Sequence, residues 1–283
     1  MSITFREVNY IYGADTNLFF HALKDINLDI KEGSFTALIG HTGSGKSTLI
    51  QHINALLLPT SGEVTIDDII INAQKKPKEL KLLRKKAGLV FQFPEYQLFE
   101  ETIEKDILFG PKNFGLEEEK AKELVRKAIK QAGLDESYLE RSPFELSGGQ
   151  KRRVAIAGIL AMSPDILILD EPTAGLDPQG SYEMMQLFKD YQKQGHTVIM
   201  VTHDMNNVLE YCDRAIVMNK GHIEKHCCVD ELFKETEYLE SLSIDLPLMT
   251  SYIEELNNKG FHIDHTIKEM NDLIKAIGGE IYE

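Results

Sequence analysis

The strongest constraint on the fold is the loop Gly40-His41-Thr42-Gly43-Ser44-Gly45-Lys46-Ser47, which matches the pattern G-x-x-x-x-G-K-[ST] at every fixed position. It follows an apolar run at residues 34–39 and precedes a segment with helical character at residues 47–57. Glycines let several backbone N–H groups of such a loop converge on one phosphate, and the helix N-terminus adds positive potential. The sequence therefore predicts a phosphate site between a buried strand and a helix, in an α/β fold.

Two acidic residues supply the second half of this predicted site. The apolar run at residues 166–169 ends in Asp170 and Glu171. A buried strand that ends in a carboxylate places Asp170 at the carboxyl edge of the sheet, where it can hold Mg²⁺ together with the Ser47 hydroxyl. Glu171 is then expected to orient or deprotonate an attacking water, and Lys46 to contact the β- and γ-phosphates.

Short strands and helices alternate along the rest of the chain, which favours a mostly parallel sheet with crossover helices. Residues 101–162 interrupt this alternation with a mostly helical insertion, and two helix-like stretches follow residue 235. The predicted strands cover residues 3–10, 26–30, 34–39, 63–66, 87–91, 166–169, 197–201 and 214–218, and the further predicted helices cover residues 117–131 and 149–162.

Charge and hydropathy exclude several classes of protein. The net charge of −14 argues against a nucleic-acid partner. Residues 75–153 nevertheless carry 18 basic and 14 acidic side chains, and seven of the twelve residues 75–86 are basic. A solvated face is the favoured interpretation of that basic run, and a surface toward a membrane partner is the alternative. No apolar run approaches the roughly 18–20 residues of a membrane span, and the N-terminus lacks a secretory signal pattern, so we expect a cytoplasmic chain.

The cysteines indicate no disulfide framework, because there are only three and two of them are adjacent. His222, His226, Cys227 and Cys228 lie close together in the sequence, but their spacing matches no common zinc pattern. Reduced thiols are the favoured interpretation.

The motif Leu146-Ser147-Gly148-Gly149-Gln150 narrows the class. It resembles the LSGGQ signature of the ATP-binding cassette (ABC) family. Other marks of that family stand in the family's order along the chain. Tyr12 would be the aromatic that stacks on adenine, with Tyr10 and Phe19 as alternatives. Gln92 follows a strand, residues 174–177 follow Glu171, and His203 follows a further strand.

The resemblance implies an α/β nucleotide-binding cassette with a mostly parallel core sheet, an N-terminal antiparallel β subdomain and an inserted helical subdomain at about residues 95–162. The cassette would cover residues 1–235, and residues 236–283 would form a C-terminal helical extension. The implied cofactors are ATP and Mg²⁺. The implied catalytic residues are Glu171, His203 and Gln92, the metal ligands are Ser47, Gln92 and Asp170, and the ATP contacts are Tyr12, Gly40, His41, Thr42, Gly43, Ser44, Gly45, Lys46, Ser47 and Thr48.

The signature residues Ser147, Gly148, Gly149 and Gln150 would act in trans. In the family, two subunits pair head to tail, and this loop of one subunit closes on the γ-phosphate bound by the other. From the residues alone, Ser147–Gly149 places a hydroxyl and unhindered backbone N–H groups at the start of a helix, which is a second anion-binding end. ATP would thus join the subunits, and hydrolysis would release them.

A narrower resemblance comes from residues 91–102, FQFPEYQLFEET, followed by ILFGP at residues 107–111. They resemble the ATPases of energy-coupling factor (ECF) transporters, most closely the second of the two paralogous ATPase subunits. This implies a peripheral protein at the cytoplasmic face of the cell membrane that powers the uptake of vitamins or transition-metal ions. Its partners would be a second ABC ATPase subunit, as a heterodimer or a homodimer, an integral membrane coupling subunit and a substrate-binding membrane subunit.

Two alternatives remain open at this point. The chain could be the ATPase of another ABC transporter, or a non-transport module whose dimerisation is gated by ATP. Residues 93–99, with Phe93, Tyr96, Leu98 and Phe99, are expected to couple the ATP sites to a membrane partner, because they combine apolar and aromatic side chains after the chain turns at Pro94. The alternative is that these side chains only pack the helical subdomain against the sheet.

Overall fold

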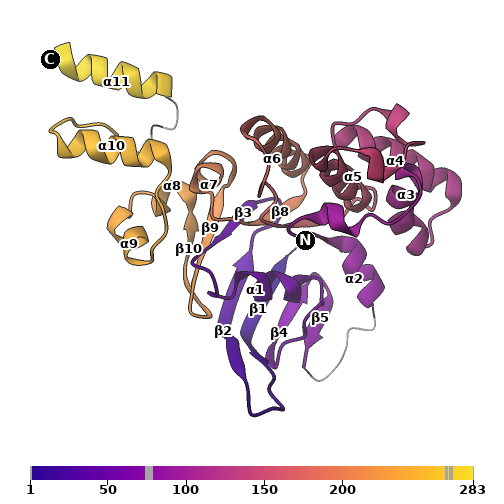
Figure 1. Ribbon diagram of the computed structural model, residues 1–283. Coiled ribbons are helices and arrows are strands. Elements are labelled where there is room, and N and C mark those ends of the chain that lie inside the picture. The colour runs from indigo at the N-terminus through magenta and orange to yellow at the C-terminus, as the bar shows by residue number, and fades with distance from the viewer. Residues whose placement is uncertain (1, 74–78, 265–266, 268–269, 283) are drawn as a thin grey trace.

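The fold consists of two sheets with helices around them (Figure 1), in a computed structural model that describes residues 2–73, 79–264, 267 and 270–282. A four-stranded antiparallel sheet has the strand order β2-β1-β4-β5, and a six-stranded sheet has the order β10-β9-β3-β8-β7-β6. The first comprises β1 (Ile3–Tyr12), β2 (Phe20–Ile30), β4 (Ser61–Ile66) and β5 (Ile69–Asn72). The second comprises β3 (Phe35–Ile39), β6 (Ala87–Val90), β7 (Ile166–Asp170), β8 (Thr197–Val201), β9 (Arg214–Asn219) and β10 (His222–Cys228).

The central sheet is parallel except at its edge, where β10 pairs with β9 in the antiparallel direction. Strand β7 shows why residues 166–169 are all apolar. Ile166 and Ile168 pack into the core shared with the antiparallel sheet and helix α1 (Lys46–Ile53), whereas Leu167 and Leu169 pack into the core on the other face. A parallel strand covered on both faces has no solvent side on which polar residues could alternate.

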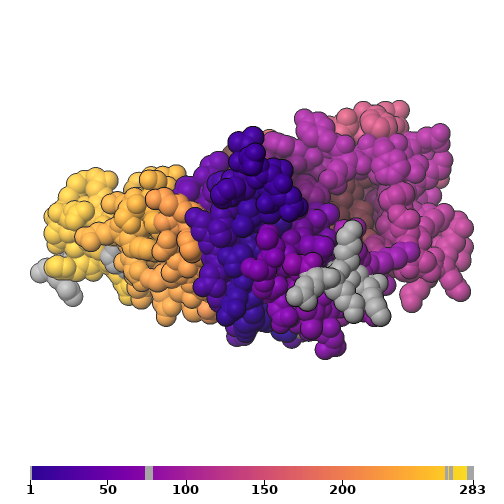
Figure 2. Space-filling view, turned by 90° about the horizontal axis from the view of Figure 1, so that it is seen from below, coloured from indigo at the N-terminus to yellow at the C-terminus, as the bar shows by residue number. Residues whose placement is uncertain are grey.

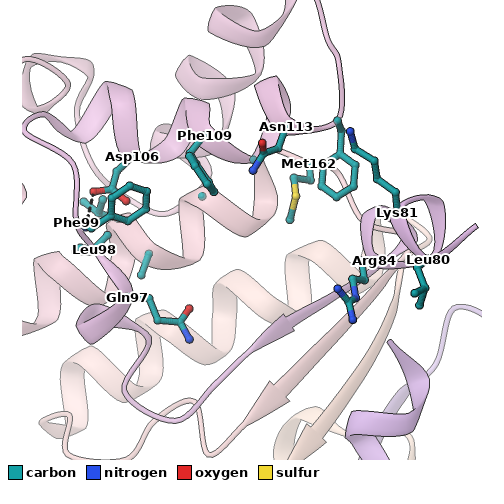
Figure 3. A pocket seen from close by; sticks show the side chains of 15 residues that line it. Leu80, Lys81, Arg84, Gln97, Leu98, Phe99, Asp106, Phe109, Asn113 and Met162 are labelled. Carbon is teal, nitrogen blue, oxygen red and sulfur yellow. Dashed lines mark hydrogen bonds between the residues drawn. The ribbon is translucent and has the colours of Figure 1, made fainter. Parts of the chain in front are cut away.

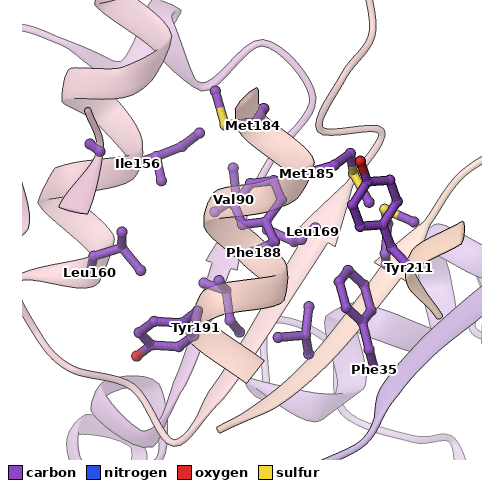
Figure 4. Packing of buried hydrophobic residues seen from close by; sticks show 14 of the residues in the cluster. Phe35, Val90, Ile156, Leu160, Leu169, Met184, Met185, Phe188, Tyr191 and Tyr211 are labelled. Carbon is purple, nitrogen blue, oxygen red and sulfur yellow. The ribbon is translucent and has the colours of Figure 1, made fainter. Parts of the chain in front are cut away.

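Helix α6 (Pro178–Lys193) covers the second face of the central sheet. Figure 4 shows Phe188 and Tyr191 of this helix against Val90 and Leu169 of two neighbouring strands. Ile156 of α5 (Gly148–Leu160) belongs to the same core, so the helix that starts at the signature motif is tied to the central sheet by apolar packing.

The helical insertion consists of α3 (Ile103–Asn113), α4 (Glu118–Gln131) and α5, with short 3₁₀ turns between them. It lies at one end of the molecule, and the C-terminal helices lie at the other, with the antiparallel sheet between them (Figures 1 and 2). Those C-terminal helices are α8 (Val229–Leu232), α9 (Thr236–Ser241), α10 (Leu248–Asn258) and α11 (Met270–Tyr282), and α7 (Met205–Tyr211) precedes β9.

Several element boundaries differ from the sequence prediction. The predicted helix end at residue 57 is wrong, because α1 ends at Ile53 and Ala55 adopts a left-handed φ of 51°. Strands β5 and β10 were not predicted. Both are edge strands; β5 is only four residues long, and β10 mixes polar and apolar side chains. The basic run at residues 75–86 lies partly outside the described residues, and its remainder contains the short helix α2 (Leu80–Lys86), in which only Leu83 is buried.

The C-terminal region packs in two parts. Leu239 and Ile244 belong to the main core beside the central sheet, whereas Ile253 of α10, Ile263 and Leu273 of α11 form a small core of their own. The region after residue 235 is therefore anchored to the main core by its first turns and continues into a helical pair.

Candidate active site

The loop between β3 and α1 has a backbone that only glycine permits at two points. Gly40 has a φ of 142°, and a Cβ atom there would lie 2.2 Å from the carbonyl oxygen of Met218. Gly45 has a φ of 107°, and its Cβ atom would lie 2.8 Å from the carbonyl oxygen of Ala22. The loop thus curls tightly against neighbouring strands, which is the backbone shape that lets N–H groups converge on an anion.

Lys46 lies inside this curl. Its Nζ atom donates hydrogen bonds to the carbonyl oxygens of Gly40, at 2.6 Å, and His41, at 3.0 Å. Burial lowers the pKa of Lys46, and the nearby carboxylates of Glu171 and Asp170 partly offset that effect. The ammonium group is therefore held by the loop itself at the point where phosphate oxygens would gather.

A cavity of about 370 Å³ joins this loop to the end of the central sheet. The structure brings Gln92, Asp170, Glu171 and His203 to its wall, as the sequence predicted. The loop and helix residues that line it are Thr42, Gly43, Gly45, Lys46, Ser47 and Thr48, and Phe20, Ala22 and Val201 complete the wall. Residues from four separate strand ends therefore meet in one cavity, which is the usual place for a ligand in a parallel α/β sheet.

The oxygen atoms in this cavity fit a magnesium ion. Burial raises the pKa of Asp170, and the nearby carboxylate of Glu171 adds to that rise. A hydrogen bond with Ser47 and the charge of Lys46 offset it only in part. A hydroxyl, an amide oxygen of Gln92 and a carboxylate are hard donors, which is the set that Mg²⁺ prefers when phosphates complete its shell. A cation would relieve the repulsion between the two neighbouring carboxylates.

The loop also fits a nucleotide phosphate. The hydroxyl of Ser44 is fully buried and has no hydrogen-bond partner among the described residues. Gly43, by contrast, has no atom within 4 Å of the position that a Cβ would take. An unpartnered buried hydroxyl beside open space over a glycine is the arrangement expected of a loop that binds an anion.

Glu171 and His203 form a pair at the cavity. Glu171 has a left-handed φ of 49°, and its backbone N–H donates to the carbonyl oxygen of Val201 at 2.9 Å. The Nδ1 atom of His203 lies 2.9 Å from Oε1 of Glu171. A strained φ at a non-glycine residue is a feature of functional sites, where the surrounding structure holds a side chain in one direction.

The aromatic residues beside the cavity include one, Phe20, that was not among the residues predicted to stack on adenine. Tyr12 is 40% exposed, and its hydroxyl lies 3.3 Å from that of Thr48, so it sits beside the loop. Tyr10, an alternative in the prediction, is held between Tyr12 and His52 by edge contacts. Phe20 lines the cavity, pairs with Tyr12 across the β1–β2 hairpin and is 59% exposed. Sequence analysis missed Phe20, because its place opposite Tyr12 depends on the strand register.

The signature residues form a separate structure. Ser147 caps α5, and a capping box links its side chain and backbone to Gln150. Gly148 and Gly149 have no atom within 4 Å of a Cβ position, and none of the residues 147–150 lines the cavity. Within one chain, this helix start is therefore an open surface rather than part of the nucleotide site.

A second cavity, of about 490 Å³, adjoins the first on the side of α7. Lys46, Glu171 and His203 line both cavities. Ser243, Ile244 and Asp245, from the C-terminal region, form part of its wall. No local signal in the sequence could have placed that segment beside the phosphate loop.

Comparisons with known proteins show the family of this chain. A family model described as ABC transporter matches residues 23–174. The energy-coupling factor transporter ATP-binding protein EcfA2 of Enterococcus faecalis is 53% identical over 93% of this chain and 92% of its own length. The protein of the same name from Ligilactobacillus salivarius is 50% identical over the full length of both chains.

Solved structures show the same fold. The structure of cbiO1 from Clostridium perfringens, part of the ABC transporter complex cbiONQ, has a TM-score of 0.74 and 41% identity, and covers 89% of this chain and 98% of that one. The ATP-binding cassette MJ0796, as a dimer bound to ADP and Pi, has a TM-score of 0.71 and 35% identity, and covers 80% of this chain and 98% of that one.

The chain belongs to the ABC transporter family, whose fold and phosphate loop it carries, and within it to the ATP-binding proteins of energy-coupling factor transporters. It is the ATPase subunit of an ECF-type importer, as the sequence predicted. None of the helices in the described part of the chain combines the length and the hydropathy that a membrane span requires.

Proposed function

We propose that the chain hydrolyses ATP with Mg²⁺ in the 370 Å³ cavity, as one half of a head-to-tail pair of ATPase subunits at the cytoplasmic face of the cell membrane. The observation that carries this proposal is the composition of the cavity. It unites Lys46, Gln92 and Glu171 with the phosphate loop, but it includes no residue of the signature motif, which a second subunit must supply.

Each residue has a role that follows from its position. The loop and Lys46 bind the phosphates, and Ser47, Gln92 and Asp170 would hold Mg²⁺, which neutralises phosphate charge when bound. Glu171 accepts a proton from the attacking water. The Nδ1–H of His203 donates to Glu171, which orients both side chains at the wall of the cavity.

The helix start at Ser147 is suited to the γ-phosphate of the other subunit. Its glycines leave the backbone N–H groups open, and the helix dipole favours a negative charge there. The similar cassette MJ0796 is dimeric in its solved structures, which supports a pair of subunits. The relatives named EcfA2 support a paralogous ATPase subunit as the second half, and a homodimer is the other possible arrangement.

A groove between α2, α3 and α5 provides the surface for an integral membrane coupling subunit (Figure 3). It encloses about 650 Å³ and is mostly apolar. Phe99 and Phe109 pack edge to face at 5.1 Å and lie 57% and 49% exposed, while Lys81 and Arg84 of α2 lie at the opposite end. Large exposed aromatic side chains in a groove are typical of a protein interface.

The segment that forms this groove starts directly after Gln92. Asp106 accepts hydrogen bonds from the backbone N–H groups of Phe99, at 3.2 Å, and Glu100, at 2.9 Å, which fixes the segment to α3. Gln97 and Leu98 also line the groove, whereas Tyr96 projects into solvent and is 85% exposed. A partner in the groove would thus contact residues that are only a few positions from a proposed Mg²⁺ ligand.

The proposed cargo is a vitamin or a transition-metal ion, selected by a substrate-binding membrane subunit. The names of the relatives, energy-coupling factor transporter and a complex with cbiO1, support this class of importer. We also propose that residues 1–235 form the cassette and residues 236–283 the helical extension, because α10 and α11 have their own small core.

The test is to express the full chain with and without a candidate pair of membrane subunits and to separate membranes from cytosol. We expect the chain to enter the membrane fraction only when the coupling subunit is present, and to support ATP-dependent uptake. Membrane association without any membrane partner would contradict the proposal. ATP-dependent dimers that never bind a coupling subunit would contradict the proposed partner of the groove.

A further inference from the structure

Arg152, in the second turn of α5, is a charged residue in an apolar setting, since its side chain is only 4% exposed. A buried guanidinium must have its N–H groups satisfied, because an unpaired charge inside a protein is very unfavourable. Arg152 meets that requirement with groups from two segments that directly follow the active-site residues Gln92 and Glu171.

The first partner is Glu95, three residues after Gln92. Nε of Arg152 donates to Oε2 of Glu95 at 3.1 Å, and Nη2 donates to Oε1 at 3.0 Å, which is a two-bond fork. The side chain of Glu95 is 15% exposed, and the guanidinium lies 5.5 Å from the ring centre of Phe93. Such a pair fixes the relative position of both groups more strictly than a single contact does.

The second partner is the turn that follows Glu171. Nη1 of Arg152 donates to the carbonyl oxygen of Ala174 at 2.7 Å and to that of Pro172 at 3.4 Å. One side chain therefore joins three segments that are far apart in the sequence: the helix that begins with the signature motif, the segment after Gln92, and the loop after the proposed catalytic carboxylate.

We propose that Arg152 is a positioning residue that couples the nucleotide cavity to the orientation of the signature helix within the same chain. A shift of Gln92 or Glu171 when the nucleotide is bound or cleaved moves Glu95 or Ala174, and α5 follows because its arginine cannot leave either partner unpaired. This inference rests on the proposed head-to-tail function, in which the orientation of Ser147 decides whether the other subunit's site closes.

The neighbouring Arg153 provides a matched control. It lies on the same helix, and its side chain is 15% exposed. Its Nη1 atom donates to the carbonyl oxygen of Ala132 at 2.9 Å, and its Nη2 atom pairs with Glu183 of α6 at 2.6 Å. These bonds stabilise the helical insertion and its contact with α6, but none of them reaches the segments after Gln92 and Glu171.

The first measurement is steady-state ATP hydrolysis by the full chain, with its paralogous partner where that is required, for Arg152→Gln, Glu95→Gln, the double variant and Arg153→Gln. We expect each single variant at the fork to lower kcat by about tenfold or more with less than about a twofold change in KM for ATP. The double variant should be no slower than the worse single variant, because both changes remove one interaction. Arg153→Gln should stay within about threefold of the wild type.

The second measurement is hydrogen exchange of the backbone amides at residues 147–160 with and without MgATP. Wild-type exchange there should slow when ATP binds, and in Arg152→Gln the change should be confined to residues 40–47. Arg152→Lys, which keeps the charge but loses the fork, serves if Arg152→Gln does not fold, and it should show a smaller loss of the same kind.

A kcat within twofold of wild type in Arg152→Gln, multiplicative effects of the two single variants, or an unchanged exchange response at residues 147–160 would overturn the coupling role. In each of those cases the proposed function would still stand if MgATP protects residues 40–47 and the wild-type protein hydrolyses ATP. If the wild-type protein shows neither this protection nor hydrolysis, the proposed function itself is contradicted.

Discussion

Nδ1 of His203 lies 2.9 Å from Oε1 of Glu171, at the point where β7 and β8 end side by side. A carboxylate can only accept, so Nδ1 carries the hydrogen and the imidazole ring is held in one orientation. The Glu171 side chain is 17% exposed, whereas that of His203 is 81% exposed. The pair therefore joins a sheltered base to a residue that remains accessible to a nucleotide and to a second subunit.

The first prediction concerns Glu171. Glu171→Gln keeps the shape and removes the proton acceptor, so kcat should fall by about 100-fold or more while ATP is still bound. The variant should accumulate as an ATP-bound dimer, measurable by size-exclusion chromatography with labelled ATP. Glu63→Gln, on an exposed part of β4, should behave as the wild type. Turnover near the wild-type rate in Glu171→Gln would contradict the role of this carboxylate.

The second prediction separates binding in cis from closure in trans. Lys46→Ala removes the charge at the phosphates and should weaken ATP binding by about tenfold or more. Ser147→Arg should leave ATP binding to the isolated chain within about twofold, because the signature loop lies outside its own cavity, but should block hydrolysis. Equilibrium binding of a fluorescent ATP analogue, alongside phosphate release, measures both.

Mixing variants tests the geometry of the pair. A mixture of Ser147→Arg and Glu171→Gln subunits contains one site with an intact carboxylate and an intact signature loop. Where mixed dimers form, hydrolysis should recover to about half the wild-type level per dimer, although each variant alone is inactive. Mixed dimers with no activity would contradict the head-to-tail arrangement.

The third prediction concerns the groove. Phe99→Glu places a charge on an exposed aromatic wall and should abolish membrane recruitment and uptake, while ATP binding to the purified chain stays within about twofold. Tyr182→Glu changes an aromatic residue of similar exposure on α6, outside the groove, and is the matched control. Co-purification of Phe99→Glu with the coupling subunit in full yield would exclude this surface.

Tyr96→Glu and Leu98→Glu complete that comparison. Leu98 lines the groove and packs against the core, so Leu98→Glu should also destabilise the fold and needs a thermal unfolding measurement beside it. Tyr96 is the most exposed aromatic residue of the segment, and its substitution should leave the unfolding midpoint unchanged. If Tyr96→Glu also abolishes recruitment, the partner contacts the segment as well as the groove.

The fourth prediction is a pH dependence of stability. His52 is fully buried in α1, its Nδ1–H donates to the carbonyl oxygen of Thr48 at 2.7 Å, and its Nε2 atom has no partner among the described residues. Burial lowers the pKa of His52 to about 4 from a usual value of 6.5. The folded protein therefore keeps His52 neutral, and protonation would leave a buried charge without a partner.

The sign follows from linkage. The stability that comes from neutral His52 is complete above pH 6.5 and is lost as the pH falls toward 4, because the unfolded chain binds the proton first. The full loss is about 3 kcal/mol in the free energy of unfolding. In denaturant titrations, the free energy of unfolding of His52→Phe should fall less between pH 6.5 and 4 than that of the wild type. His222→Gln, at an exposed position, should show the same fall as the wild type. Parallel curves for wild type and His52→Phe would contradict the prediction.

The sequence by itself determined the parts of the site that a single segment can specify. The loop at residues 40–47 needs glycines at fixed positions because its backbone has φ values that other residues rarely adopt, and those glycines can be read without knowing the fold. The run before Asp170 is apolar because a central parallel strand is covered on both faces. Both patterns reflect requirements that are local to the chain.

The tertiary structure decided which distant residues meet. The hydrogen bond between Glu171 and His203 depends on where two strands end, the position of Phe20 depends on hairpin register, and the contacts of Arg152 join residues up to 57 positions apart. Asp245 reaches the wall beside the phosphate loop only through the packing of the C-terminal region. Such contacts are set by the packing of whole elements. The residues next to an arginine or an aspartate in the sequence therefore do not indicate which distant residue it will contact.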